Sequence, residues 1–180
     1  NCKKGIEQPE WLFGATLNIA EACLQAQPGA TAITYGHEDG TIDQCSYHQL
    51  QERAFQVANG LQAGGFEKGH RAAICMPMTA EAVAIYLGVI LAGGAVVSIA
   101  DSLAPTEVEK RLTIAETDLL FTQDVIPRSG KQIALYAKLS PLEKLPPTVV
   151  LPGMDTVQGN LRAADQEWEH FLGGAGRPAI

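Results

Sequence analysis

The sequence predicts an α/β fold in which a parallel sheet carries helices on both faces, beside a small antiparallel hairpin. Three short apolar segments, residues 71–76, 95–100 and 118–122, have strand character. Two helical segments, residues 80–91 and 105–116, lie between them. Strand, helix, strand, helix, strand is the order of parallel βαβ units, so we expect the three strands to be neighbours in one sheet.

A helix and a hairpin are predicted ahead of this sheet. Residues 10–25 suit a helix, since apolar side chains recur there at Trp11, Leu17, Ile19, Ala20 and Leu24. Residues 31–35 and 41–45 resemble strands and flank the turn residues Glu38, Asp39 and Gly40. Two such runs around a turn predict an antiparallel hairpin.

The segment after the hairpin predicts a well-capped helix. Ser46 stands three residues before Gln49, the spacing of a capping box. The apolar residues that follow fall on one helix face, at Leu50, Ala54, Val57, Ala58 and Leu61. Gly64 and Gly65 end the helix.

Local signals also delimit the two helices between the predicted strands. Thr79 can cap the helix over residues 80–91, which is apolar nearly all round and is therefore expected to be buried on more than one side. Gly88, Gly93 and Gly94 loosely resemble a phosphate loop, but the sequence lacks its Lys and Ser/Thr. We interpret the last two glycines as the helix end. Pro105 opens the next helix.

The rest of the chain is less regular. After the third strand we expect an irregular basic stretch, and then a fourth strand at residues 148–151. Residues 142–147 fit a helix end or a linker, and residues 153–165 are expected at the surface.

Composition excludes several function classes. The chain has 180 residues, 46% of them hydrophobic and 18% charged, which is typical of a folded domain. The formal net charge of −7 argues against nucleic acid as a partner, because nucleic-acid scaffolds present a basic face. We expect no membrane span either, since the longest apolar run, residues 82–97, is short and broken by glycines.

We expect an intracellular, cytoplasmic protein without disulfides. The four cysteines have neither the Cys-x-x-Cys spacing of a redox site nor that of a zinc site. The first residues lead into no apolar signal segment. The absent initiator Met and the glycine-rich end suggest a piece of a longer protein.

Two groups of residues are candidates for ligand binding. Ser98, Asp101 and Ser102 follow a predicted strand end, where ligands of open α/β sheets bind, although their spacing alone favours turn formation and capping of the next helix. Arg128 and Lys131 flank Gly130 after the third strand, and suit either a phosphate or a solvated surface.

Metal binding is weakly indicated. His48 and Glu52 have the i, i+4 spacing of two metal ligands, but no third ligand is near in sequence. We therefore favour a solvated ion pair and expect no metal site.

Several blocks of the sequence resemble one known family. They are Trp11 to Asn18, Ser46-Tyr47-His48-Gln49-Leu50, Phe66 to Ala82 with Met76-Pro77-Met78-Thr79 inside it, Val97 to Ser102 with Phe121-Thr122-Gln123-Asp124, and Glu167-Trp168-Glu169-His170-Phe171. These blocks are similar to the amino-terminal part of acyl-CoA synthetases, in the adenylate-forming, AMP-binding superfamily. The acetyl-CoA synthetase branch and the plant peroxisomal acyl-activating enzymes are the most similar.

This resemblance implies an ATP-dependent carboxylate–CoA ligase that takes part in fatty acid metabolism. Such an enzyme forms acyl-AMP with Mg²⁺ and then acyl-CoA, so its partners are a carboxylic acid, ATP and CoA. It also adds the peroxisome as an alternative location. The family's phosphate loop and catalytic lysine have no match here, so we expect no catalytic residue, no tightly bound cofactor and no activity of this piece alone.

The resemblance also bears on the candidate site. Arg128 and Lys131 match the two cations that contact the 3′-phosphate of CoA in acetyl-CoA synthetases. Asp101 and Ser102 stand in the turn where the family has glycines beside CoA. Within a partial AMP-binding domain over residues 1–180, the expected parts are a leading segment (1–30), the hairpin (31–45), the sheet region (46–152) and a surface segment (153–180). The rival hypothesis is a standalone, non-catalytic α/β binding module.

Overall fold

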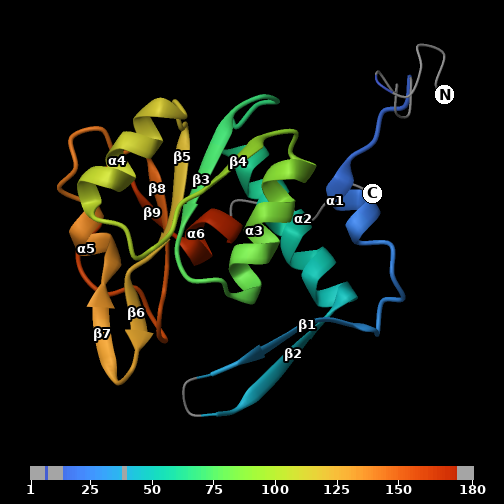
Figure 1. Cartoon of the computed structure of the whole chain (residues 1–180), viewed down its shortest axis with the longest axis horizontal. Helices are drawn as coiled ribbons and strands as arrows, with labels where there is room; N and C mark the ends of the chain where they lie inside the picture. The colour runs from blue at the N-terminus through green and yellow to red at the C-terminus, as the bar shows by residue number, and fades with distance from the viewer. Residues whose placement is uncertain (1–6, 8–13, 38–39, 174–180) are drawn as a thin grey trace.

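The computed structural model describes residue 7 and residues 14–37 and 40–173. At its centre lies a five-stranded sheet in the order β4-β3-β5-β8-β9, in which every neighbouring pair is parallel (Figure 1). Its strands are β3 (Arg71–Cys75), β4 (Ala95–Ser98), β5 (Leu119–Gln123), β8 (Thr148–Leu151) and β9 (Gln166–Glu167). The three strands predicted as parallel neighbours are confirmed, and so is the fourth.

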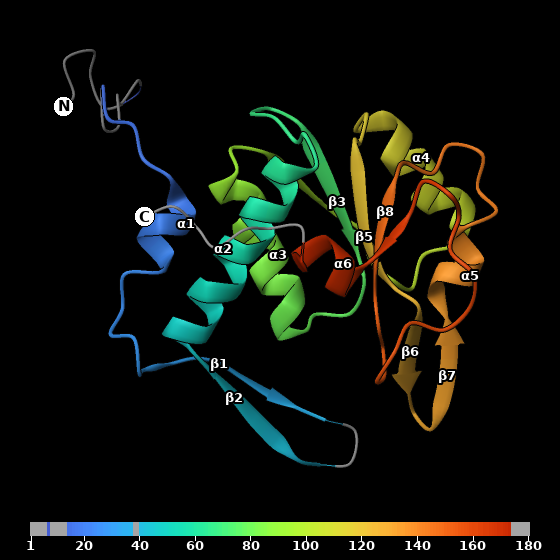
Figure 2. The same cartoon turned by 180° about the vertical axis from the view of Figure 1, so that it is seen from behind.

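Helices cover both faces of the sheet, as predicted (Figures 1 and 2). One face carries α2 (Tyr47–Ala63), α3 (Ala80–Leu91) and α6 (Trp168–Gly173), which share a hydrophobic cluster with the strands. The other face carries α4 (Pro105–Ile114) and α5 (Leu135–Leu139), with a second cluster beneath them. The three central strands, β3, β5 and β8, are buried between these two layers, which explains why their residues are mostly apolar.

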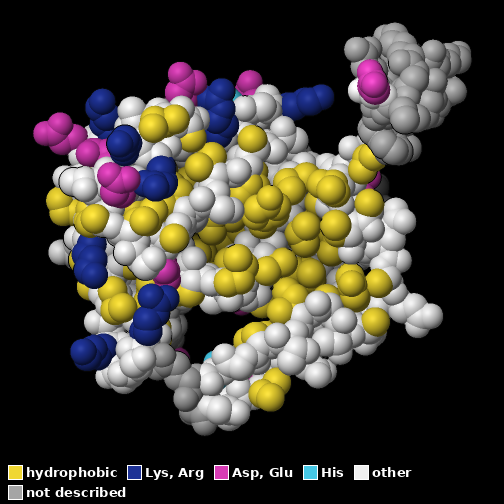
Figure 3. All heavy atoms as spheres, in the orientation of Figure 1, with side chains coloured by type: hydrophobic (Ala, Val, Ile, Leu, Met, Phe, Trp, Pro, Cys, Tyr) yellow, Lys and Arg dark blue, Asp and Glu magenta, His cyan; other side chains and the backbone are white. Residues whose placement is uncertain are grey.

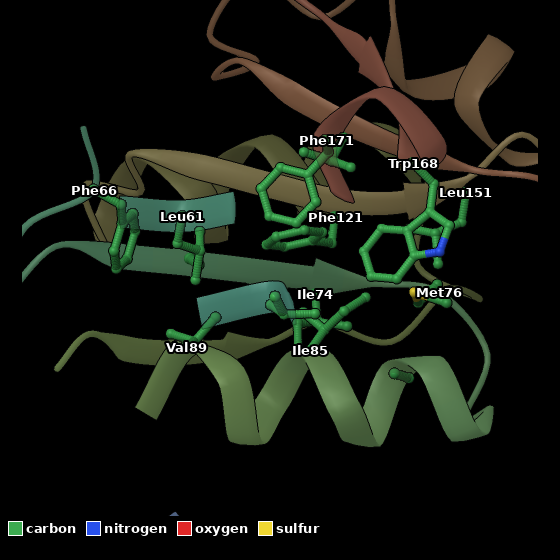
Figure 4. Packing of buried hydrophobic residues seen from close by; sticks show 14 residues of the cluster. Leu61, Phe66, Ile74, Met76, Ile85, Val89, Phe121, Leu151, Trp168 and Phe171 are labelled. Atoms are coloured by element: carbon green, nitrogen blue, oxygen red, sulfur yellow. The ribbon is translucent and has the colours of Figure 1, made fainter. Parts of the chain in front are cut away.

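An aromatic group anchors the first layer. Phe121 of β5 is fully buried and meets the rings of Trp168 and Phe171 edge to face, at centroid distances of 6.4 and 5.4 Å. Figure 4 shows both α6 rings turned toward Phe121, with Ile85 of α3 pointing into the same cluster. Each such ring pair adds about 1 kcal/mol to the area it buries, so α6 is firmly attached although it is short.

The ends of the central helices follow their predicted signals. Ser46 and Gln49 form the complete capping box of α2, and Thr79 caps α3 by accepting a hydrogen bond from the Ala82 amide. Gly93 follows α3 with a φ of +83°, and its amide donates to the carbonyl of Ile90. The amide of Gly94 donates to the carbonyl of Val89. This is a Schellman helix end, which confirms the helix-end interpretation over a phosphate loop.

The hairpin is also confirmed, but the leading helix is shorter than predicted. β1 (Thr31–Gly36) pairs antiparallel with β2 (Ile42–Ser46). The leading helix α1 spans only Ile19–Cys23, because Asn18 caps it by accepting a hydrogen bond from the Ala20 amide. Residues 14–17, which precede that cap, are not helical. Trp11, Glu38 and Asp39 lie outside the described residues.

The basic stretch after β5 is not irregular, which corrects the prediction. It forms a second hairpin, β6 (Val125–Arg128) and β7 (Lys131–Ala134). The two turn residues, Ser129 and Gly130, have φ values of 53° and 71°. Positive φ at both positions is typical of a type I′ turn, whose twist matches that of the strands. The prediction failed because each strand is short and Pro127 argues against a strand.

Residues 142–147 form a linker, since α5 already ends at Leu139. The helix predicted to reach Glu116 ends at Ile114, and Glu116 takes a φ of 48°. Within the described part of the chain, no helix is long and apolar enough to cross a membrane.

Candidate functional site

A cavity of about 430 Å³ opens at the carboxyl ends of β3 and β4. The strand ends and the loops after them form one side, α3 forms another, and the tip of the β6–β7 hairpin contributes Arg128. The lining residues are Ile74, Met76, Pro77, Met78, Ala82, Val83, Tyr86, Leu87, Ser98, Ile99, Ala100, Asp101 and Arg128. Ligands of open α/β sheets bind at this edge, outside the carboxyl ends of the strands.

The cavity is apolar along α3 and charged at one end. Met78 and Tyr86 on its α3 side are 86% and 44% exposed, so apolar surface faces solvent there. Figure 3 shows hydrophobic side chains gathered over the centre of this face, where α3 lies, and basic side chains beside the β6–β7 hairpin. A ligand with a flat or apolar body and an anionic end would match this distribution.

The charged end consists of an ion pair between Asp101 and Arg128. An Nη of Arg128 donates a hydrogen bond to a carboxylate oxygen of Asp101 at 2.7 Å. The Asp101 side chain is only 13% exposed, whereas that of Arg128 is 45% exposed. Asp101 lies in the turn after β4, which the Leu103 amide closes by donating to the Ala100 carbonyl. The structure therefore brings together two of the predicted site residues.

Of the other three candidate residues, Ser98 lines the cavity, whereas Lys131 and Ser102 lie outside its lining. Lys131 is the cross-strand partner of Arg128 in the hairpin, so both cations flank the same turn. Ser102 is exposed in the turn that also holds Asp101. Two like charges opposite each other on a hairpin repel, and a nearby anion relieves that repulsion.

The hairpin that carries both cations is anchored by a residue without a predicted role. The Asp124 carboxylate is buried and accepts hydrogen bonds from the amides of Val125, Gly153 and Gln158, each at 2.6 Å. It thereby joins the start of β6 to the loop after β8. In the sequence, Asp124 follows a predicted strand and is itself followed by the apolar residues Val125 and Ile126. That position was the available signal, because a carboxylate buried among apolar residues needs hydrogen-bond donors.

Residues 153–165 lie at the surface, as predicted, but the side chain of Asp165 at the end of this segment is a second buried carboxylate. The Asp165 side chain is 0% exposed and receives hydrogen bonds from Tyr136, Arg162 and the Thr148 amide. Burial alone would raise the pKa of Asp165, but the hydrogen bonds from Arg162 and Tyr136 outweigh it and the pKa is lowered. This cluster attaches the loop before β9 to β8 and α5.

Cys75, between the lining residues Ile74 and Met76, carries a buried thiol that is held in its neutral form. Cys75 ends β3 and is fully buried. Burial, and to a smaller extent the Asp101 charge, raises the pKa of Cys75 to about 12. The thiol is therefore neutral near pH 7.

No cluster of three or more metal-ligating side chains occurs among residues 14–37 and 40–173. His48 and Glu52 lie on the exposed side of α2 with 3.7 Å between Nε2 and Oε1, which is the geometry of a solvated ion pair.

Comparison with known proteins gives the family context of this site. Residues 20–172 match the model of the AMP-binding enzyme family. The probable peroxisomal acyl-activating enzyme 18 of Arabidopsis thaliana is 41% identical, over 97% of this chain and 25% of its own length. Hexanoyl-CoA synthase of Cannabis sativa is 38% identical, over 91% of this chain and 24% of its own length.

A solved structure shares the fold. Acetoacetyl-CoA synthetase from Streptomyces lividans superposes with a TM-score of 0.81 at 27% identity, over 94% of this chain and 27% of that chain. The chain thus spans about a quarter of the length of these relatives. With a family match over most of its residues, this chain belongs to the AMP-binding enzyme family.

Proposed function

We propose that this chain is part of an ATP-dependent carboxylate–CoA ligase. The complete enzyme forms acyl-AMP from a carboxylic acid and ATP with release of pyrophosphate, and then transfers the acyl group to the thiol of CoA. Family membership and the names of the relatives, which include a hexanoyl-CoA synthase and an acetoacetyl-CoA synthetase, support this reaction over a standalone binding module.

Within this enzyme we propose that the cavity beside β3 and β4 receives the nucleotide end of CoA. The observation that carries the proposal is Arg128, a half-exposed guanidinium at the charged end of an otherwise apolar cavity. Arginine is well suited to phosphate, because its planar donors match phosphate oxygens. Arg128 and Lys131 contact the 3′-phosphate, while Asp101 and Ser102 form the turn that borders it.

The chemical steps are assigned to other parts of the enzyme. The described residues offer no metal-ligand cluster and no activated thiol near the cavity. The groups that grip the ATP phosphates, hold Mg²⁺ and select the acid are proposed to lie in the remaining three quarters of the family's length. This chain would supply the parallel sheet, its two helix layers and the CoA phosphate contact.

We propose a peroxisomal or cytoplasmic location for the complete enzyme. The Arabidopsis relative is named as peroxisomal, and no described helix could span a membrane. Imaging of the complete, fluorescently tagged protein against a peroxisomal marker separates the two locations.

The proposed CoA contact is tested by removing both cations in the complete enzyme. ATP–pyrophosphate exchange and thioester formation are measured separately for the Arg128→Ala, Lys131→Ala double variant. An exposed charge contact is worth about 1 kcal/mol, so we expect the KM for CoA to rise roughly 10- to 30-fold while exchange is unchanged. The phosphate is remote from the thiol and is bound alike in ground and transition states, so the effect falls on KM.

A second double variant controls for the change in net charge. Lys110→Ala, Arg111→Ala removes two exposed cations from α4, neither of which lines the cavity. We expect its KM for CoA to match that of the wild type. An unchanged KM in the Arg128, Lys131 variant, or an equal loss of exchange, would show that these cations do not bind CoA.

A further inference from the structure

Arg128 is already engaged by a carboxylate from the same chain. Its hydrogen bond to Asp101 is a single contact at 2.7 Å, made from one Nη. Both residues line the same cavity, so an anion that enters to reach Arg128 also meets the Asp101 charge. We propose that Asp101 is an internal counter-ion that competes with the phosphate of the ligand for Arg128, and so limits the preference for CoA over dephospho-CoA. This inference rests on the proposed function.

The two partners differ in their freedom to separate. Asp101 is held in the closed turn after β4, with only 13% of its side chain exposed. Arg128 reaches from the tip of a hairpin and is 45% exposed. When a phosphate binds, the arginine can therefore turn or share its donors, while the carboxylate stays at the end of the cavity.

The charges at this end define the size of the effect. Arg128 and Lys131 contribute two positive charges and Asp101 contributes one negative charge, so the anion site has a net charge of +1. A phosphate monoester carries between one and two negative charges near pH 7. The two cations attract these charges, and the Asp101 carboxylate repels them. The site is half-exposed, so solvent partly screens these interactions. Removing the Asp101 charge should therefore strengthen phosphate binding by about 3- to 10-fold.

A merely structural role for Asp101 predicts that removing its charge weakens CoA binding instead of strengthening it. If the carboxylate served to orient Arg128 toward the ligand, its removal would loosen the guanidinium and weaken CoA binding. The two roles are separated by comparing CoA with dephospho-CoA, which lacks only the 3′-phosphate. A general change in the cavity alters both substrates, whereas competition for Arg128 alters only the phosphorylated one.

The test uses Asp101→Asn in the complete enzyme, with kcat/KM measured for CoA and for dephospho-CoA. We expect kcat/KM for CoA to rise about fivefold through a lower KM, and that for dephospho-CoA to stay unchanged. In an Arg128→Ala background, Asp101→Asn should raise the ratio of kcat/KM for CoA to that for dephospho-CoA by less than in the wild type, because only the direct repulsion between the carboxylate and the phosphate is then removed. Asp101→Ser is a second variant, and thermal unfolding verifies that both remain folded.

Glu116→Gln is the matched control. Glu116 pairs with Arg71 at 2.9 Å, and Arg71 is 43% exposed, close to the exposure of Arg128. That pair lies at the amino end of β3, the opposite edge of the sheet from the cavity. Removal of this pair should leave the ratio of kcat/KM for CoA to kcat/KM for dephospho-CoA at the wild-type value.

The outcomes separate this inference from the proposed function. A lower or unchanged preference for CoA in folded Asp101 variants overturns the counter-ion role, provided that the Arg128→Ala, Lys131→Ala variant binds CoA more weakly. If that double variant leaves CoA saturation unchanged, the proposed phosphate site itself is wrong, and the counter-ion role is overturned with it.

Discussion

Gly88 of α3 packs directly against Val57 of α2. A Cβ placed on Gly88 would lie 2.6 Å from the Cβ of Val57 and 2.8 Å from the carbonyl oxygen of Ala54. Real Cβ atoms do not come so near a backbone oxygen, so any larger residue must push the helices apart. A glycine inside a helix lowers its stability by about 1 kcal/mol relative to alanine. Here the missing side chain of Gly88 permits the close packing of α2 on α3.

Gly88→Ala is therefore expected to destabilise the fold, although alanine is the better helix former. We expect a loss of about 1–3 kcal/mol in the free energy of unfolding, measured by urea denaturation, because overpacking a rigid contact outweighs the gain in helix propensity. Gly29→Ala is the control, since a Cβ there would meet no atom within 4 Å. A stability of Gly88→Ala at or above wild type would contradict the close helix contact.

The Asp165 cluster predicts a pH-dependent contribution to stability. Asp165→Asn removes a buried carboxylate that pairs with Arg162, so we expect a loss of about 3 kcal/mol at pH 7. The folded-state pKa of Asp165 is lowered, so its contribution is present above the unfolded pKa and disappears as pH falls through the folded value. Urea denaturation of both proteins from pH 7 to pH 2.5 should show the difference shrinking as acid protonates Asp165.

Asp155→Asn serves as its control, because Asp155 is an exposed carboxylate of the same loop. Its stability should follow that of the wild type at every pH. A constant difference between wild type and Asp165→Asn across this range would rule out the ionised pair as the source of stability.

The thiols should differ sharply in reactivity. Cys75 is fully buried with its pKa raised to about 12, so at pH 8 only about one molecule in 10⁴ carries the thiolate. Cys23 is exposed, and Cys45 is intermediate, with its pKa raised mainly by burial. Single-cysteine variants treated with a chromogenic disulfide reagent should react in the order Cys23, Cys45, Cys75.

The Cys75 thiol should react fully once the protein is unfolded in guanidinium chloride, which provides the internal control. Prompt reaction of Cys75 in the native protein would mean that the end of β3 opens readily to solvent. Cys2 lies outside the described residues, so it is replaced by serine in every variant of the series.

The 180 residues by themselves should not catalyse acid-dependent exchange of pyrophosphate into ATP. The chain covers about a quarter of the length of its relatives, so we expect most residues of the adenylation site to lie in the rest of the enzyme. Exchange is measured with radiolabelled pyrophosphate and a panel of short- and medium-chain acids, with the complete enzyme as positive control. Exchange above background by this chain alone would place the adenylation site within these residues.

Much of the central fold could be predicted because its signals are local. The strands around Ile74 and Phe121 are short apolar runs, and Thr79 and Gly93 mark the two ends of the helix between β3 and β4. Each signal depends on residues close together in sequence, such as the capping box of Ser46 and Gln49. Alternation of these elements was then enough to predict the parallel order, because a βαβ connection leaves few other arrangements.

The second hairpin and the short elements at the carboxyl side could not be predicted in this way. Strands of four residues with Pro127 in one of them carry a weak local signal. The hairpin forms where it does because Asp124 gathers three amides from segments up to 34 residues away. α6 likewise depends on Phe121, a residue of a different element, to bury its two aromatic rings.

The candidate site, too, was predicted only in part from the sequence. The sequence by itself determined that Asp101 follows one strand and that Arg128 and Lys131 follow another, and so which residue types were available for a phosphate. Only the tertiary structure decided that Asp101 and Arg128, 27 residues apart, meet at 2.7 Å on one cavity, whereas Ser102 and Lys131 lie outside its lining. The physical reason is that local patterns define the strands, while the pairing of charges between loops depends on how those strands are ordered in the sheet.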